Sequence, residues 1–246
     1  MLPLGSSRIF FRSSNWFFLL ILIYFLLVSG LPVEAQAPTK KNATPKEKAV
    51  PTLFEQMRAN PWSEIKGFRS AKFGMDEKSV YRAIAKDFKM AKSKVKTKLN
   101  PQEKTSALEI IVPDLFATGG TAKVGYVFGY KSKKLIHINV LWGRGAAENV
   151  DGLSVVNTAN LLRTHFLKKR YKKKSLAVNS KLSADSTLVF RGRDKKDRMI
   201  VVLLNATVPE GGNTEESLNN ISLVLSYVES PDKPDVRKIS IKDGEF

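Results

Sequence analysis

The sequence predicts an α+β protein: a tandem repeat of one helix plus four antiparallel strands, with the helices packed on one face of the sheet. Two segments, near 76–89 and 152–170, repeat apolar residues at the helical period. Each is followed by four short segments with the alternation or apolar runs of strands. The strands that begin near 122 and near 198 are separated by the same interval as the two helices, which favours a duplicated unit.

The first helix has a clear start and one apolar stripe. Asp76 can cap the free N–H groups, and Glu77 is favourable in the first turn. Val80, Ile84 and Phe88 recur every four residues and predict the buried side. Four strands should follow, at residues 95–99, 107–112, 124–128 and 136–142. In the last of these, Ile136, Ile138, Val140 and Trp142 should share one face.

The second half repeats this order. Its helix carries an apolar stripe made by Val155, Ala159, Leu162 and Phe166. The strands predicted after it cover residues 174–180, 186–192, 198–206 and 219–228. Turn-forming residues separate the later strands, which supports antiparallel neighbours.

The chain is expected to have five parts. Residues 1–35 form a signal peptide, and 36–52 form a disordered basic linker rich in proline and lysine. The two α+β units cover 53–148 and 149–230. A polar tail, 231–246, follows them.

Residues 16–28 are thirteen apolar or aromatic side chains in a row, preceded by Arg8 and Arg12. A basic start, a short apolar core and a small-residue exit are the parts of a secretory signal. As a helix the run would reach about 20 Å, against a hydrocarbon core of about 30 Å. The expected cleavage is after Ala35, with Ala37 as the alternative. If the segment is not removed, it would attach the protein to the membrane.

Charge and cysteine content limit the function. The chain has 41 basic and 23 acidic residues, a formal charge of +18, and no cysteine. The charge predicts attraction to a polyanion: an anionic envelope component, an acidic protein or nucleic acid, of which export makes nucleic acid the least favoured. The absence of cysteine excludes disulfides, thiolate sites and a lipid-modified N-terminal cysteine.

Three basic segments are the candidate surface for an anionic partner. Their residues are Lys168, Lys169, Arg170, Lys172, Lys173 and Lys174; Lys92, Lys94, Lys96 and Lys98; and Arg191 and Arg193. The four lysines from 92 to 98 alternate, which would place them on one strand face. Ordinary solvation and protection of an exposed strand edge would also explain them.

No catalytic, cofactor-binding or metal site is expected, and no cofactor. His137 is interpreted as a solvated histidine on the sheet face opposite the core, and His165 as a packed residue beside the helix stripe. Neither has metal-site spacing with a second ligand. No serine lies in a Gly-x-Ser-x-Gly elbow, and no glycine cluster has Walker spacing.

The stretch Gly67–Val80, GFRSAKFGMDEKSV, resembles the opening motif of a group of uncharacterised bacterial secreted and periplasmic proteins. Val127–Ile136 and Val189–Gly192 are also similar to that group. More distantly, the Gly74-Met75 turn into a helix is similar to small outer-membrane assembly lipoproteins and to the tandem fold of β-lactamase-inhibitory proteins. The two distant resemblances imply the fold and binding of other proteins, whereas the first implies no particular activity. The chain departs from the lipoproteins in having no cysteine.

Together these patterns predict an exported, non-catalytic binding or envelope-assembly protein that uses a basic surface. An envelope hydrolase with an unrecognised site and a signal-anchored subunit of a membrane complex are the alternatives.

Overall fold

The computed structural model describes residues 52–116, 119–207 and 214–238. The predicted signal peptide and all but the last residue of the predicted linker lie outside these ranges. Within them, no helix is both long and apolar enough to cross a bilayer.

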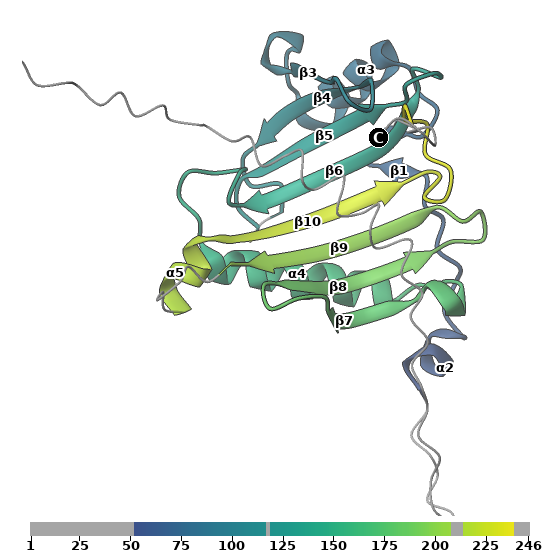
Figure 1. The fold of residues 1–246 in the computed structure, drawn as a ribbon, viewed down its shortest axis with the longest axis vertical. Coiled ribbons are helices and arrows are strands. Elements are labelled where there is room, and N and C mark those ends of the chain that lie inside the picture. The colour runs from purple at the N-terminus through teal and green to yellow at the C-terminus, as the bar shows by residue number, and fades with distance from the viewer. Residues whose placement is uncertain (1–51, 117–118, 208–213, 239–246) are drawn as a thin grey trace, which may run out of the picture. The chain divides into compact units, whose positions relative to one another are not determined.

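The described chain forms an eight-stranded sheet in which every neighbouring pair is antiparallel (Figure 1). In spatial order the strands are β3 (Lys96–Asn100), β4 (Thr105–Val112), β5 (Ala122–Phe128), β6 (Leu135–Gly143), β10 (Ile221–Val228), β9 (Met199–Ala206), β8 (Ser186–Arg193) and β7 (Ala177–Lys181). The middle pair joins the two halves of the chain, with Val140 of β6 opposite Leu225 of β10. The α+β class and the antiparallel sheet are confirmed.

The other elements are shorter. They are α2 (Leu53–Met57), the hairpin β1 (Gly67–Phe68) and β2 (Ala71–Lys72), α3 (Glu77–Phe88), the 3₁₀ turn η1 (Lys92–Lys94), α4 (Gly152–Leu167), the 3₁₀ turn η2 (Lys173–Ser175) and α5 (Thr214–Asn219). Asp76 caps α3 by accepting a hydrogen bond from the Ser79 N–H at 2.8 Å. α4 ends before the predicted Arg170, because the Arg170 N–H donates to the Pro61 carbonyl at 2.9 Å instead of continuing the helix.

α4 contacts β6, β8, β9 and β10, and it lies behind the sheet in Figure 1. Its predicted stripe is buried, and the Phe166 ring stacks on Phe190 of β8 at 5.3 Å between centroids. Val80 and Ile84 of α3 belong to the same core cluster. Burying each large apolar side chain contributes about 1.5–3 kcal/mol, so this core is the main source of stability in a chain without disulfides.

The two central strands are buried on both faces. Val202 and Leu223 face the core cluster, whereas Leu203 and Val224 pair on the opposite face, and all four are at most 2% exposed. Strand β9 reads Met-Ile-Val-Val-Leu-Leu, without polar alternation. Such a continuous apolar run is typical of a strand buried on both faces.

A bulge corrects the predicted face pattern of β6. The register shifts between Val127 and Phe128 of the neighbouring β5, which pairs Phe128 with Leu135. Leu135 is therefore the fully buried core residue, and Ile136 is only partly buried. His137 lies opposite the core as predicted, but it is 8% exposed, so the expectation that it is solvated was wrong.

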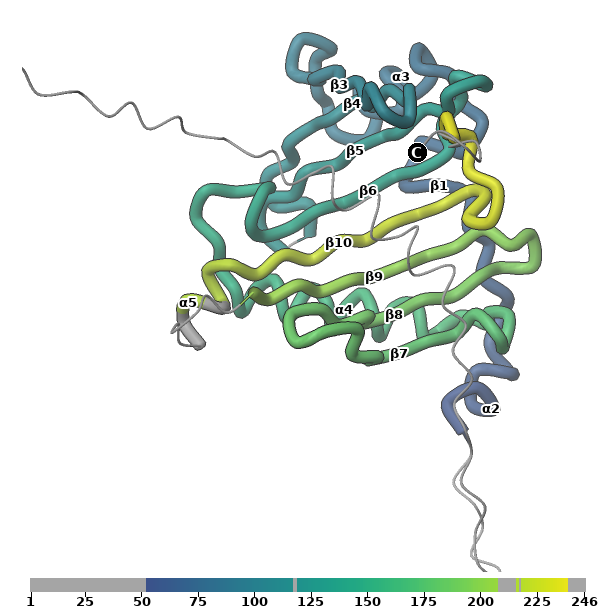
Figure 2. Tube along the Cα trace, viewed as in Figure 1, coloured from purple at the N-terminus to yellow at the C-terminus, as the bar shows by residue number. Residues whose placement is uncertain are grey.

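Residues 229–238, which we call the C-terminal strap, follow β10 along the chain (Figure 2). The Asp232 carboxylate pairs with the Arg193 guanidinium through two hydrogen bonds of 2.7 and 2.8 Å. The Asp235 carboxylate accepts from the backbone N–H of Ser132 at 2.8 Å in the β5–β6 hairpin. The first part of the predicted polar tail is thus anchored to the fold.

Candidate anion-binding surface

Two of the three basic segments meet at one end of the sheet. The segment from Lys168 to Lys174 runs from the end of α4 into η2, beside the end of β8. The Lys172 N–H donates to the Arg193 carbonyl at 3.0 Å, and the Arg193 N–H donates to the Ser175 hydroxyl at 2.9 Å. We call residues 168–174, residues 191–198 and Trp62 the basic corner.

An aromatic side chain fixes the two basic segments to each other. Tyr171 is 2% exposed and contacts the Phe190 ring at 5.1 Å between centroids. Its ring lies against Gly192, where a Cβ would come within 2.6 Å of it. Burial raises the pKa of the Tyr171 phenol to about 12. Tyr171 is therefore a neutral anchor that directs its lysine neighbours outward.

Trp62 brings a third segment to this corner. The Ser63 N–H donates to the Arg170 carbonyl at 2.9 Å, which aligns residues 61–63 with the end of the basic run. The Arg170 guanidinium lies 4.5 Å from the centroid of the Trp62 ring, and the Lys195 amine lies 5.1 Å from it. Cations at these distances interact favourably with the ring, so Trp62 holds two positive charges close together.

Asp194 orders the loop that carries Lys195 and Lys196. Its carboxylate is 4% exposed and accepts the backbone N–H groups of Lys196 at 2.8 Å and Arg198 at 3.1 Å. It also accepts the Ile65 N–H at 2.9 Å. The buried acid thus supports the backbone of a surface loop whose side chains are basic.

Only part of the positive charge of the basic corner is neutralised by acidic residues of the protein. Lys172 pairs with Asp197, and Arg193 with Asp232. The hydrogen bonds that Arg193 donates to Asp232 raise the pKa of the Arg193 guanidinium, whereas desolvation lowers the pKa of Arg191, which is half-buried. Among the described residues, ion pairs are found for none of Lys168, Lys169, Lys173, Lys174, Lys195 and Lys196.

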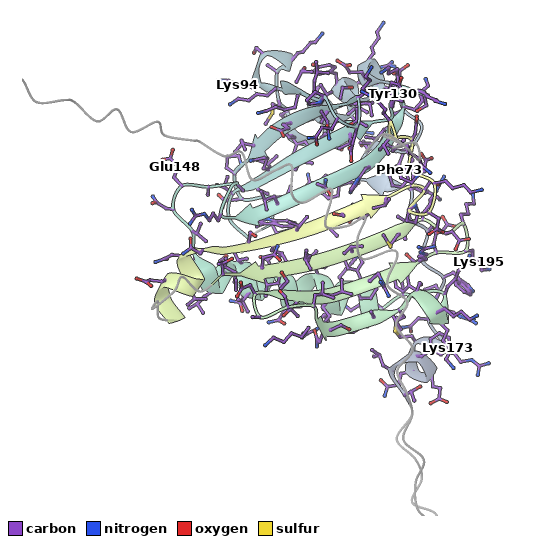
Figure 3. All side chains as sticks on the ribbon, in the orientation of Figure 1. Phe73, Lys94, Tyr130, Glu148, Lys173 and Lys195 are labelled. Carbon is purple, nitrogen blue, oxygen red and sulfur yellow. The ribbon has the colours of Figure 1, made fainter. Side chains whose placement is uncertain are left out.

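The third basic segment lies elsewhere. Lys92 and Lys94 belong to the turn η1, and only Lys96 and Lys98 lie on the strand β3, so the prediction of one four-lysine strand face was wrong. The turn forms because the Val95 N–H bonds back to the Lys92 carbonyl. β3 and β7 are the two edges of the sheet, about 34 Å apart at normal strand spacing. In Figure 3, Lys94 lies at the upper edge, far from Lys173 and Lys195 at the right.

No group of residues that could hold a metal ion is present in the described part of the chain. His137 is buried, and burial lowers its pKa to about 4, so it is neutral at physiological pH. His165 is exposed and contacts the edge of the Phe166 ring rather than lying in a packed boundary. The two histidines lie on different elements, β6 and α4.

Sequence reasoning missed the residues that organise the corner. Trp62 lies in a polar stretch without periodicity, so nothing local marks it as a platform. Asp194 begins a turn-forming stretch, Asp-Lys-Lys-Asp, which could have indicated a carboxylate that bonds to nearby backbone N–H groups. Its bond to Ile65 depends on tertiary structure alone.

No family model, curated protein or solved structure matches the chain. The resemblances to secreted and periplasmic proteins, to outer-membrane assembly lipoproteins and to β-lactamase-inhibitory proteins therefore stay predictions.

Proposed function

We propose that this is an exported, non-catalytic protein that binds an anionic envelope component or an acidic protein through the basic corner. The observation that carries the proposal is the meeting of residues 168–174 and 191–198 around Trp62. Like charges repel, so gathering them needs stabilising contacts, and Tyr171 and Asp194 supply these here. Export is inferred from the apolar run 16–28.

The fold is proposed to be a tandem repeat with both helices on one face of the sheet. In its support, α3 and α4 are each followed by a 3₁₀ turn and four strands, with α5 before the last strand of the second set. The last strands of the two sets, β6 and β10, pair at the centre of the sheet. Side chains of α3 and α4 share one core cluster. A duplicated unit would place η1 and η2 at opposite sheet edges, so a single partner would meet one of them.

Binding by the full chain to envelope fractions and to poly-glutamate, measured against salt concentration, tests this function. We expect affinity to fall steeply with salt, since exposed charges are screened within about 10 Å at 0.1 M. Changing Lys168, Lys169, Lys173 and Lys174 to glutamine should weaken binding by about tenfold, if each of the four exposed contacts is worth about 0.3–0.4 kcal/mol.

The matched control removes the same charge from the other edge, at Lys92, Lys94, Lys96 and Lys98. This variant should retain most of the binding, because the basic corner is intact. Binding that is indifferent to salt, or equal in both variants, would contradict the proposed surface.

A further inference from the structure

A groove of about 460 Å³ lies beside the basic corner, between α2 and the start of β7. Leu53 and Phe54 line it on one side, and Leu176 and Val178 on the other. Leu176 and Val178 also pack against the core cluster, so that wall is part of the rigid fold. A groove of this size is within the range of known ligand sites.

The groove is apolar inside and basic at its rim. Leu53 is 39% exposed, so it presents apolar surface at the groove. Lys173 lies over the Phe54 ring, with its amine 5.5 Å from the centroid. Its aliphatic stem thus covers apolar surface while its charge stays in water. A ligand with an apolar group next to negative charge would complement both features.

The acid that lines the groove is already engaged. The Glu55 carboxylate accepts the Thr52 N–H at 2.7 Å and the Thr52 hydroxyl at 3.0 Å, which closes a capping box on α2. These hydrogen bonds, and to a smaller extent the charge of Lys173, lower the pKa of Glu55. Lys173 and the adjacent Lys174 form no ion pair among the described residues. Glu55 interacts with Lys173 without forming a close ion pair, so the amines at the rim can still pair with an external carboxylate.

Strand addition does not explain this site well. β7 is an edge strand, but Asn179 has a φ of +50° and is skipped in the pairing of Val178 and Ser180 with β8. A break of this kind blunts an edge against further pairing. A free fatty acid is also a poor fit. Small ligands are usually mostly buried, and this groove is open, so it would leave most of an acyl chain in water. A side chain on a longer polypeptide suits such a groove.

We propose that the groove anchors one large apolar side chain of an acidic polypeptide segment, whose carboxylates meet Lys173 and Lys174. The inference rests on the proposed function. Of the two partners proposed there, an anionic envelope component and an acidic protein, it selects the acidic protein. The electrostatic attraction of the basic corner should weaken as the salt concentration rises. Burial of the apolar side chain in the groove should not depend on salt.

Two labelled peptides of aspartate, glutamate, serine and glycine, identical except for one central leucine or serine, test this with the full chain. The leucine peptide should bind about tenfold tighter or more, as expected for burial of one leucine side chain. That ratio should persist at high salt while both affinities fall. Leu53→Gln should abolish the ratio, and the matched control Leu161→Gln, an exposed leucine on α4, should preserve it.

Other results would reject the groove, the proposed function or the polypeptide nature of the ligand. Equal binding of the two peptides, or a ratio that survives Leu53→Gln, rejects the groove but leaves the electrostatic surface standing. Failure of both peptides, together with salt-indifferent binding to envelope fractions, rejects the proposed function as well. Tighter binding of dodecanoate than of the leucine peptide, lost in Leu53→Gln, rejects a polypeptide in favour of an anionic amphiphile.

Discussion

The Asp194 carboxylate accepts the backbone N–H of Ile65 at 2.9 Å, across 129 positions of sequence. The same carboxylate accepts two N–H groups of its own loop, from Lys196 and Arg198. One buried acid therefore joins the segment after Trp62 to the loop that presents Lys195. Both cations on the Trp62 ring depend on this junction for their relative position.

Asp194→Asn should separate these two segments. An asparagine side chain has one accepting oxygen and one NH₂ group in place of the two carboxylate oxygens. The NH₂ group would therefore face either the Ile65 N–H or the loop N–H groups, and a donor cannot bond to a donor. Leaving a buried donor unpaired costs about 1–3 kcal/mol, and we expect a loss of this size in the free energy of unfolding. Urea denaturation measures it, with Asp185→Asn, at an exposed aspartate, as the control. Equal stability of both variants would show that Asp194 is not the junction.

Gly192→Val should displace the Tyr171 ring. A Cβ at position 192 would lie 2.6 Å from the ring, and two further methyl groups would increase the overlap. Overpacking of a tight core costs about 1–3 kcal/mol, and the basic run 168–174 should lose its alignment with β8. We expect a lower melting temperature and weaker poly-glutamate binding together. Unchanged binding in a folded variant would show that the position of the Tyr171 ring does not affect the binding surface.

His137 should make stability depend on pH. Burial lowers its folded-state pKa to about 4, whereas an unfolded histidine titrates near 6.5. Between these values the unfolded chain binds more protons, so this contribution is complete above about pH 6.5 and is lost as pH falls toward 4. The slope should be at most about 1.4 kcal/mol per pH unit. Urea unfolding between pH 7.5 and 5 should show it, and it should vanish in His137→Gln but persist in His165→Gln.

Asp232→Asn should loosen the C-terminal strap. The hydrogen bonds from Arg193 lower the pKa of Asp232, so its contribution is present above the unfolded value of about 3.9 and is lost as pH falls through the folded value. Because Asp232 is largely exposed, the loss should stay below about 1 kcal/mol. Hydrogen exchange should quicken in residues 229–238 alone. Faster exchange throughout β8 would instead indicate a global role for the pair.

Local patterns predicted much of the fold because each depends on nearby residues. The stripe of α4 is a helical repeat, and Asp76 caps α3 by accepting from an N–H three residues away, so both can be predicted without knowing the sheet. The bulge that pairs Leu135 with Phe128 could not be predicted, because it arises from the register between β5 and β6. The burial of His137 also depends on its neighbours across the sheet.

For the candidate surface too, part could be predicted from the sequence and part depends on the tertiary structure. The sequence by itself determined how many basic residues the chain has and in which runs they occur. It could not determine that residues 168–174 and 191–198 meet while 92–98 lies at the opposite edge, since strand order decides this. The cation contacts of Trp62, the bond from Ile65 to Asp194 and the groove beside Lys173 depend on tertiary structure alone, because the partners are distant along the chain and are brought together only by packing.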